Sequence, residues 1–245
     1  MVLSDASRSE ILRRFGGTYT DLDAIALRPL PNGTNWLAEF YDGRVTAALS
    51  SFLPGHTLFQ RVVDAIPRAF NPYACCSIGP DLVTAEMQHL CPDAFSSIVA
   101  DDLQEPVVCS DITVLPIGNF YPINYDMGPR GFSQLLRSGT GQEFLKSTKA
   151  HSLHLFSSLT AKDLLYLGGG SILEEVAKRY CPKVFKTQRS ISAVMESELT
   201  GVNQVLCTCI PRQHQGRADD LMNWDGTAGF TEITLQISVS HLAQV

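Results

Sequence analysis

The chain has 245 residues, of which 44% are hydrophobic and 18% charged, and its net charge is −6. This length and apolar content fit one α/β domain, or a domain with an appended tail. The hydrophobic core of such a domain is large enough to fold without stabilising disulfides or bound metal ions. The acidic balance and the absence of Lys/Arg blocks argue against nucleic acid and anionic membrane surfaces as main partners.

The N-terminal residues predict an amphipathic helix over residues 5–15. Ser4 is a candidate N-cap, and four apolar residues then recur at helical spacing: Ala6, Ile11, Leu12 and Phe15. Gly16 and Gly17 are expected to end this helix, because glycine readily adopts the left-handed conformation of a C-cap. Residues 18–27 then predict a short strand with a turn at its polar centre.

That polar centre holds Asp21 and Asp23. Alternate side chains share a face in an extended segment, so both carboxylates can point to one side while Leu22 packs the other way. Two hard oxygen ligands suit Mn²⁺ or Mg²⁺, which could bridge to a nucleotide diphosphate as a glycosidic bond breaks. A bare pair is common in solvated turns, but Asp5 and Arg8, one helical turn apart, can face the same pocket.

Later elements follow in chain order. Helical periodicity extends over residues 58–70 and 79–90, the first closed by Asn71-Pro72 and the second with Pro80 in its first turn. Residues 111–117 and 151–157 predict strands.

A glycine run, Gly168 to Gly170, precedes a predicted helix that extends to Tyr180. Its spacing fits neither dinucleotide nor Walker phosphate loops. A capping box formed by Ser171 and Glu174 is therefore the favoured interpretation.

The seven cysteines do not predict a structural zinc site, because Cys75-Cys76 and Cys207-Thr208-Cys209 lack the spacing of zinc knuckles. The single N-glycosylation sequon, Asn32-Gly33-Thr34, lies in a proline-bounded loop. Four histidines receive no role: His56, His89, His214 and His241. Residues 186–245 are rich in Ser, Thr and Gln, and only Ile233, Leu235, Ile237 and Val239 alternate like a strand. We interpret this stretch as an appendage.

The N-terminal block consists of Leu3–Arg8, a seven-residue spacer that ends in Phe15, the pattern Gly-Gly-x-Tyr-x-Asp-x-Asp, and Ile25–Leu30. It resembles glycosyltransferase family 32, whose sugar-binding region contains a DXD motif, and within it the α-1,4-glycosyltransferases. Further blocks follow in the family's order: Gly79–Thr84, Thr113–Pro116, Phe120–Ile123 and Arg179–Pro182. His154 lies where a family strand reads His-x-Trp-Asn. The resemblance covers residues 3–185.

The resemblance implies an α/β fold of the GT-A type, a Rossmann-like fold of nucleotide-sugar transferases. Only twenty residues precede the Asp-x-Asp pair, so we expect the first strands of that fold to be missing. The implied domains are a partial glycosyltransferase domain over residues 1–185 and the appendage over 186–245. The implied site has Asp21 and Asp23 as catalytic and metal-binding residues, with four residues binding substrate: Asp5, Arg8, Tyr19 and His154.

The implied activity is metal-dependent transfer of a hexose, galactose or N-acetylglucosamine, from a UDP-sugar to a glycolipid or glycan acceptor in α linkage, with Mn²⁺ or Mg²⁺ as cofactor. The resemblance also implies the Golgi lumen or membrane, and makes Cys91, Cys109 and Cys181 disulfide candidates. No apolar run here approaches the ~20 residues that span a bilayer, so we expect the family's membrane anchor to be absent from this chain and the chain as given to be soluble.

Three departures from the family pattern define an alternative. Cys75–Ile78 replaces Trp-Gly-His-Gln, Thr46–Leu49 replaces Asn-Gly-Ala-Phe, and Phe156 with Ser157 replaces Trp-Asn. These exchanges remove hydrogen-bonding groups from the expected pocket, which would weaken transition-state binding. The alternative is a catalytically inactive, truncated homologue with a binding or structural role.

Overall fold

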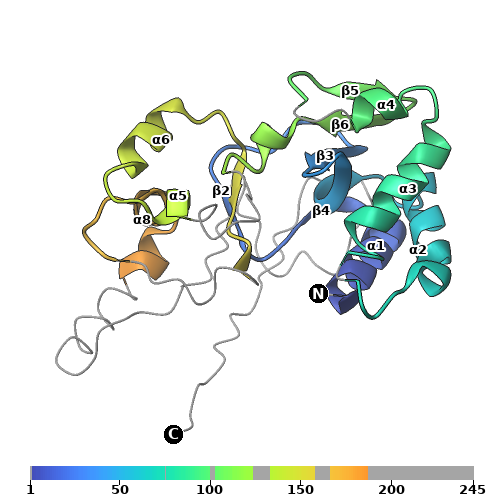
Figure 1. The fold of residues 1–245 in the computed structure, drawn as a ribbon, viewed down its shortest axis with the longest axis horizontal. Helices are drawn as coiled ribbons and strands as arrows, with labels where there is room; N and C mark the ends of the chain where they lie inside the picture. The colour runs from blue at the N-terminus through green and yellow to red at the C-terminus, as the bar shows by residue number, and fades with distance from the viewer. Residues whose placement is uncertain (1, 75, 100–102, 124–132, 158–165, 187–245) are drawn as a thin grey trace, which may run out of the picture. The chain divides into compact units, whose positions relative to one another are not determined.

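A computed structural model describes residues 2–74, 76–99, 103–123, 133–157 and 166–186 (Figure 1). Its main sheet has five strands in the order β1-β4-β3-β6-β5. The strands are β1 (Gly17–Thr20), β3 (Trp36–Phe40), β4 (Arg44–Phe52), β5 (Val107–Cys109) and β6 (Ile112–Leu115). Neighbours in this sheet are antiparallel except β3 and β6, which pair in parallel with Leu37 opposite Val114. The sheet is therefore mixed, as in the expected α/β class.

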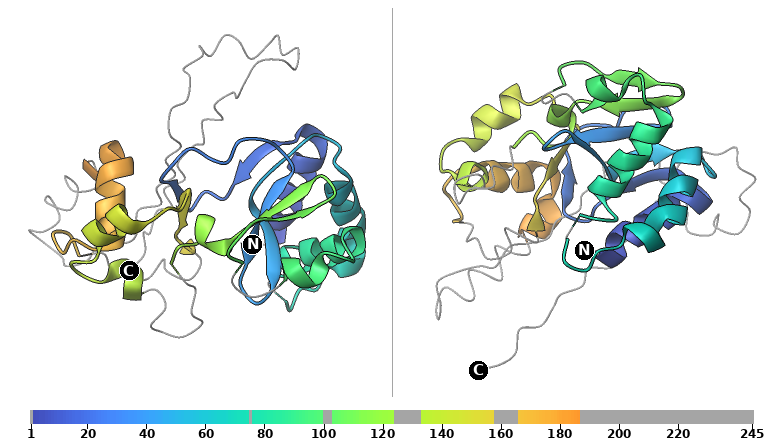
Figure 2. Two further views of the ribbon diagram at one scale, coloured as in Figure 1. Left: turned by 90° about the horizontal axis from the view of Figure 1, so that it is seen from above. Right: turned by 45° about the vertical axis from the view of Figure 1, so that its right-hand side comes forward.

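Three helices pack on this sheet: α1 (Val2–Phe15), α2 (Thr57–Ala69) and α3 (Pro80–Leu90). Helices α1 and α3 contact β4, and α2 contacts both of these helices (Figures 1 and 2). The short helix α4 (Phe95–Ile98) follows α3. The core between the helices and the sheet contains fully buried side chains from several elements, among them Leu12, Leu37, Phe52, Phe59 and Met87. Burial of these apolar surfaces is the main contribution to the stability of this part of the chain.

A second, smaller core forms around the two-stranded ladder of β2 (Ala24–Ala26) and β7 (Ser152–His154). The strands are antiparallel, with Ile25 opposite Leu153 and Ala24 opposite His154. Helices α5 (Ser133–Leu136), α6 (Gly141–Ser147) and α8 (Ile172–Tyr180) contribute to this core through Leu135, Phe144 and Val176. The ladder places the end of β7 directly beside the residues that follow Asp23.

A third cluster is rich in aromatic side chains. The short helix η1 (Ile117–Asn119) follows β6, and the next residues bring Phe120 and Tyr121 into contact with Trp36, Leu49 and Phe156. The rings of Trp36 and Phe120 stack with centroids 5.4 Å apart. These aromatic residues pack directly behind the turn that carries the Asp-x-Asp pair.

Most predicted elements are confirmed with shifted ends, but the N-cap of the first helix was wrong. The helix includes Val2, so Ser4 lies inside it, and its hydroxyl accepts a hydrogen bond from Arg8 Nη2 at 3.4 Å. The predicted strand over residues 18–27 is split by its polar turn into β1 and β2.

The capping-box prediction at α8 is half confirmed. The Ser171 hydroxyl accepts a hydrogen bond from the backbone N–H of Glu174 at 3.2 Å, as expected of an N-cap. The Glu174 carboxylate instead accepts from the N–H groups of Gly168 and Gly170, both at 2.7 Å, and pairs with Lys178. Two of the three backbone N–H groups of this glycine run are thus already satisfied by a carboxylate, which agrees with rejecting it as a phosphate loop.

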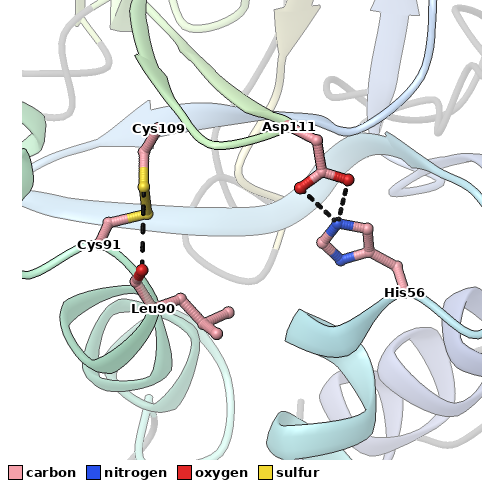
Figure 3. The surroundings of a disulfide bond; sticks show 5 residues. All are labelled: His56, Leu90, Cys91, Cys109 and Asp111. Atoms are coloured by element: carbon pink, nitrogen blue, oxygen red, sulfur yellow. Dashed lines mark hydrogen bonds and ion pairs between the residues drawn. A yellow bond between two sulfur atoms is a disulfide. The ribbon is translucent and has the colours of Figure 1, made fainter.

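Two of the predicted cysteines form one disulfide. Cys91, at the end of α3, bonds to Cys109 in β5, and the pair lies near His56 and Asp111 (Figure 3). Cys181 is also disulfide-bonded. Cys75, Cys207, Cys209, His214, His241 and the predicted strand around Ile233 lie outside the described residues. Within the described residues, every helix is too short or too polar to cross a membrane.

Candidate active site

A tight turn, and not the pleat of a strand, brings Asp21 and Asp23 to one side. The Asp21 N–H donates to the carbonyl of Ala48 in β4 at 2.9 Å, and the Ala24 N–H donates back to the Asp21 carbonyl at 3.3 Å. Leu22, at the tip of this turn, is 49% exposed. Leu22 was expected to pack on the side opposite the carboxylates, and this was wrong, because the chain reverses at this residue and leaves its side chain exposed.

Arg8 joins helix α1 to this turn. Its Nη2 lies 3.0 Å from Asp5 Oδ1 and 3.1 Å from Asp21 Oδ1, and the side chains of Arg8 and Asp5 are buried. The Tyr19 hydroxyl donates to the same Asp21 oxygen at 3.1 Å, and the Arg8 guanidinium lies over the Tyr19 ring at 5.4 Å. Such a buried charge is tolerated only because it is paired and hydrogen-bonded.

Two glycines allow the close packing that positions α1. At Gly16, whose φ is +60°, an added Cβ would lie 2.4 Å from the Pro54 backbone nitrogen. At Gly79, the residue before α3, an added Cβ would lie 2.9 Å from Asp5 Cγ. Glycine at position 79 therefore leaves the space that the Asp5 carboxylate occupies, which gives a physical reason for the Gly-Pro block.

The electrostatic environment of Asp5 is unusual for a carboxylate. Burial raises the pKa of Asp5 above its ordinary value, the positive charge of Arg8 opposes this, and the negative charge of Asp21 adds to it. The pKa of Tyr19 is also raised, first by burial and then by Asp21. A low-dielectric pocket strengthens every electrostatic contact made inside it.

His154 completes the cluster from the end of β7. Its Nε2 lies 3.2 Å from Asp23 Oδ1 and 3.7 Å from Asp21 Oδ2, and one ligand atom from each of the three residues fits within 4.8 Å of the others. The Nδ1 atom accepts a hydrogen bond from the Phe156 N–H at 3.1 Å. In this arrangement the ring proton is on Nε2 and points toward the carboxylates.

The segment after His154 wraps around Asp23. The Ser157 N–H donates to Asp23 Oδ2 at 2.8 Å, and the Leu155 N–H donates to the Asp23 carbonyl at 2.8 Å. Phe156, with φ at +49°, makes the reversal that permits both bonds. As a result, one oxygen of each aspartate faces His154 and the other is engaged by the protein.

The donor set of this cluster fits a hard or borderline divalent cation. Carboxylates are the usual protein ligands of Mg²⁺ and Mn²⁺, and an imidazole suits the transition metals. Ligation through His154 Nε2 requires the ring proton to move to Nδ1, which breaks the bond from the Phe156 N–H. Asp21 and Asp23 therefore fit a metal as they stand, and His154 fits after this change.

Several buried polar atoms near this cluster have no hydrogen-bond partner within the described part of the chain: Arg8 Nε, Tyr121 Oη and Ser157 Oγ, together with Trp36 Nε1 in the aromatic cluster. Burial raises the pKa of Tyr121, and the charges of Asp21 and Asp23 act in the same direction, whereas Arg8 opposes them. Sequence reasoning does not single out Tyr121, although the Phe-Tyr-Pro-Ile block that contains it is part of the family resemblance.

The structure brings all six sequence-predicted site residues into one neighbourhood: Asp5, Arg8, Tyr19, Asp21, Asp23 and His154. The residues that depart from the family pattern have various surroundings. Ala48 supplies the carbonyl that holds the Asp21 N–H, and Ile78 is buried in the main core. The Ser77 hydroxyl accepts from the Asn71 N–H at 3.1 Å, away from the carboxylates.

Comparison with known proteins gives relatives of one kind. The chain is 27% identical over 203 residues to an alpha-1,4-N-acetylglucosaminyltransferase of Homo sapiens, a match that covers 82% of this chain and 55% of that protein. It is 28% identical over 189 residues to a lactosylceramide 4-alpha-galactosyltransferase of Rattus norvegicus, a match that covers 74% of this chain and 48% of that protein. It is 25% identical over 189 residues to the Homo sapiens protein of the same name, a match that covers 77% of this chain and 50% of that protein. The chain thus spans about half the length of these relatives.

No solved structure matches the chain significantly. The family model described as the alpha 1,4-glycosyltransferase conserved region matches residues 51–188, which is more than half of the chain. This region includes Tyr121 and His154, whereas the Asp-x-Asp turn precedes it. The chain belongs to the α-1,4-glycosyltransferase family.

Proposed function

We propose that this chain binds a UDP-sugar together with Mn²⁺ or Mg²⁺ and transfers its hexose, in α linkage, to a glycan or glycolipid acceptor in the Golgi. The observation that carries the proposal is the cluster of Asp21, Asp23 and His154, whose ligand atoms lie within 4.8 Å of one another beside a buried arginine. Family membership supports glycosyl transfer, and the names of the relatives supply galactose and N-acetylglucosamine as candidate sugars.

In this proposal Asp21 and Asp23 hold the cation and His154 is the third ligand. The cation, when bound, stabilises the negative charge of the nucleotide diphosphate. Asp21 Oδ2 and Asp23 Oδ1 are the oxygens that would hold it, because Arg8 and Tyr19 engage the other oxygen of Asp21 and Ser157 engages the other oxygen of Asp23. These contacts fix the rotation of both carboxylates before any ligand arrives.

Arg8 and Asp5 orient the transferred sugar. A guanidinium offers a planar fork of donors that stays charged at any working pH, and a carboxylate accepts from sugar hydroxyls. Among the described residues, the Arg8 Nε–H has no hydrogen-bond partner. The Nη2 atom of Arg8 forms ion pairs with both Asp5 and Asp21. The guanidinium is thus held by its protein contacts, and it keeps one donor that no described residue uses.

The test is calorimetric titration of UDP in the presence and absence of Mn²⁺. We expect Mn²⁺-dependent binding by the wild-type chain and its loss in Asp23→Asn, which keeps an acceptor for the Ser157 N–H while removing the charge. Asp64→Asn is the matched control, because Asp64 is an exposed carboxylate on α2. Equal Mn²⁺ dependence in Asp23→Asn and wild type would refute the metal site.

The second candidate is a homologue that binds the donor without turning it over. The observation in its favour is that Ile78 is buried in the core, so this position offers no polar group where the family pattern has an amide. Incubation with UDP-galactose or UDP-N-acetylglucosamine, Mn²⁺ and a lactosyl acceptor separates the candidates. Transfer product supports the enzyme, and Mn²⁺-dependent binding without product supports the homologue.

A further inference from the structure

The Tyr121 side chain combines deep burial with an unused polar atom. It is 4% exposed, and its hydroxyl has no hydrogen-bond partner within the described residues. A buried hydroxyl without a partner is unfavourable by an amount comparable to a lost hydrogen bond, so native structures rarely keep one without a reason. Phenylalanine would fill the same space without this penalty.

The surroundings of Tyr121 indicate what the hydroxyl serves. Its ring packs beside the metal-site histidine, with the centroids of Tyr121 and His154 5.4 Å apart, and against Phe156 at 6.0 Å. The charges of Asp21, Asp23 and Arg8 all act on the Tyr121 hydroxyl. The hydroxyl is therefore held by an aromatic cluster close to the candidate metal and donor site.

Two other unpartnered atoms belong to residues that touch the same aspartates. Arg8, whose Nε is unpaired within the described part of the chain, contacts Asp21, and Ser157, whose Oγ is likewise unpaired there, donates its N–H to Asp23. Arg8 Nε and the Tyr121 hydroxyl are both hydrogen-bond donors. A ligand that satisfies them must carry acceptor oxygens, as a diphosphate or a hexose does.

We propose that Tyr121 is a donor-binding residue whose hydroxyl donates a hydrogen bond to an oxygen of the nucleotide sugar held at Asp21 and Asp23. This inference rests on the proposed function. It adds one residue from the aromatic cluster to the proposed donor site. It also gives the stacked aromatic residues a role, since they hold the Tyr121 ring rigidly and so keep its hydroxyl in place at small entropic cost on binding.

The same cluster provides a matched control. The Tyr41 ring lies 6.3 Å from the Tyr121 ring, but the Tyr41 hydroxyl donates to the Ile123 carbonyl at 2.9 Å. Tyr41→Phe therefore removes a hydroxyl that the folded chain already uses, whereas Tyr121→Phe removes one that it does not. The two variants delete the same atom type from one aromatic cluster.

The experiment measures unfolding by urea and affinity by calorimetry for both variants, with Mn²⁺ and either UDP or UDP-galactose. We expect Tyr121→Phe to unfold at the same or a higher urea concentration than wild type and to bind ligand about tenfold more weakly, which corresponds to about 1.4 kcal/mol. Tyr41→Phe should show the reverse, with lower stability and unchanged affinity. A loss with UDP assigns the contact to the nucleotide, and a loss with UDP-galactose alone assigns it to the hexose.

Unchanged affinity in Tyr121→Phe, or a loss of stability as large as that of Tyr41→Phe, would overturn this inference and leave the metal site intact, because wild type would still bind Mn²⁺ and UDP. If wild type binds no UDP at any Mn²⁺ concentration, the proposed function fails and the role of Tyr121 fails with it. The wild-type titration thus distinguishes the two failures.

Discussion

Arg8 Nη2 and Asp21 Oδ1 lie 3.1 Å apart, and this ion pair connects the first helix of the chain to the turn that carries the Asp-x-Asp motif. Because Asp5 shares the same nitrogen at 3.0 Å, the helix contributes both a cation and an anion to the site. The arrangement leads to four predictions about this chain.

Arg8→Lys should lower turnover by roughly tenfold or more while changing UDP affinity much less. An ammonium cannot reproduce the fixed fork of a guanidinium, and the proposed contact is to the transferred hexose and not to the nucleotide. Steady-state kinetics and UDP titration of the same preparation measure the two effects. Equal losses of turnover and of UDP affinity would instead mean that Arg8 contacts the phosphates or has a structural role.

His154→Ala should weaken Mn²⁺ binding at least tenfold, because loss of a ligand or of its supporting contact typically lowers metal affinity by about 10–100-fold. Ligation through Nε2 also breaks the bond between Phe156 N–H and His154 Nδ1. Addition of Mg²⁺ should therefore increase the hydrogen-exchange rate of the Phe156 amide in the wild-type chain. If that amide stays protected, the carboxylates alone hold the cation.

Gly79→Ala should destabilise the fold by about 1–3 kcal/mol, the usual range for overpacking. The added methyl group would lie 2.9 Å from Asp5 Cγ, and Asp5 is itself tied to Arg8. Gly118→Ala is the control, since an added Cβ there meets no atom within 4 Å. Urea denaturation of both variants is the measurement, and equal stabilities would show that α3 shifts to accommodate the methyl group at no cost.

Asp5→Asn should stabilise the ligand-free chain at neutral pH. Burial raises the pKa of Asp5 above 3.8, so the folded state holds its proton more tightly than the unfolded state. The free energy of unfolding therefore falls as the pH rises from 3.8 through the raised pKa of Asp5 in the folded state. This loss of stability persists at pH 7. The difference in unfolding free energy between Asp5→Asn and wild type should disappear toward acid pH, and a constant difference would contradict this assignment.

The N-terminal half of the site was predictable because its geometry is local. The spacing of Asp5 and Arg8 requires only a helix, and Gly16 and Gly17 bring the chain back beside it. The predictions that Leu22 packs opposite the carboxylates and that Ser4 caps the helix were wrong for local reasons as well, since a turn replaced a strand and the helix began earlier. The pattern of residues in a short segment does not show at which residue a helix begins or a strand gives way to a turn.

The other half depends on contacts between distant parts of the sequence. His154 reaches Asp23 because β2 and β7 pair with Ala24 opposite His154, a register that no local pattern encodes. The unused hydroxyl of Tyr121 follows from how Trp36, Phe120 and Phe156 pack around it. The sequence can show which residue types are present, but tertiary packing decides which polar atoms are left over.

The way in which Asp21 and Asp23 are held has a consequence for the choice of ion. Asp21 Oδ1 already pairs with both Arg8 and Tyr19, so Asp21 cannot chelate a cation with both oxygens without losing one of these contacts, and the Ser157 N–H occupies one acceptor position of Asp23 Oδ2. Ca²⁺ takes about 6–8 oxygen ligands and often uses bidentate carboxylates, whereas Mg²⁺ is smaller and accepts one or two carboxylates with the rest of its shell from water and phosphate. If Asp21 and Asp23 hold the proposed cation, the fixed rotation of the Asp21 carboxylate would therefore favour small, six-coordinate ions over Ca²⁺.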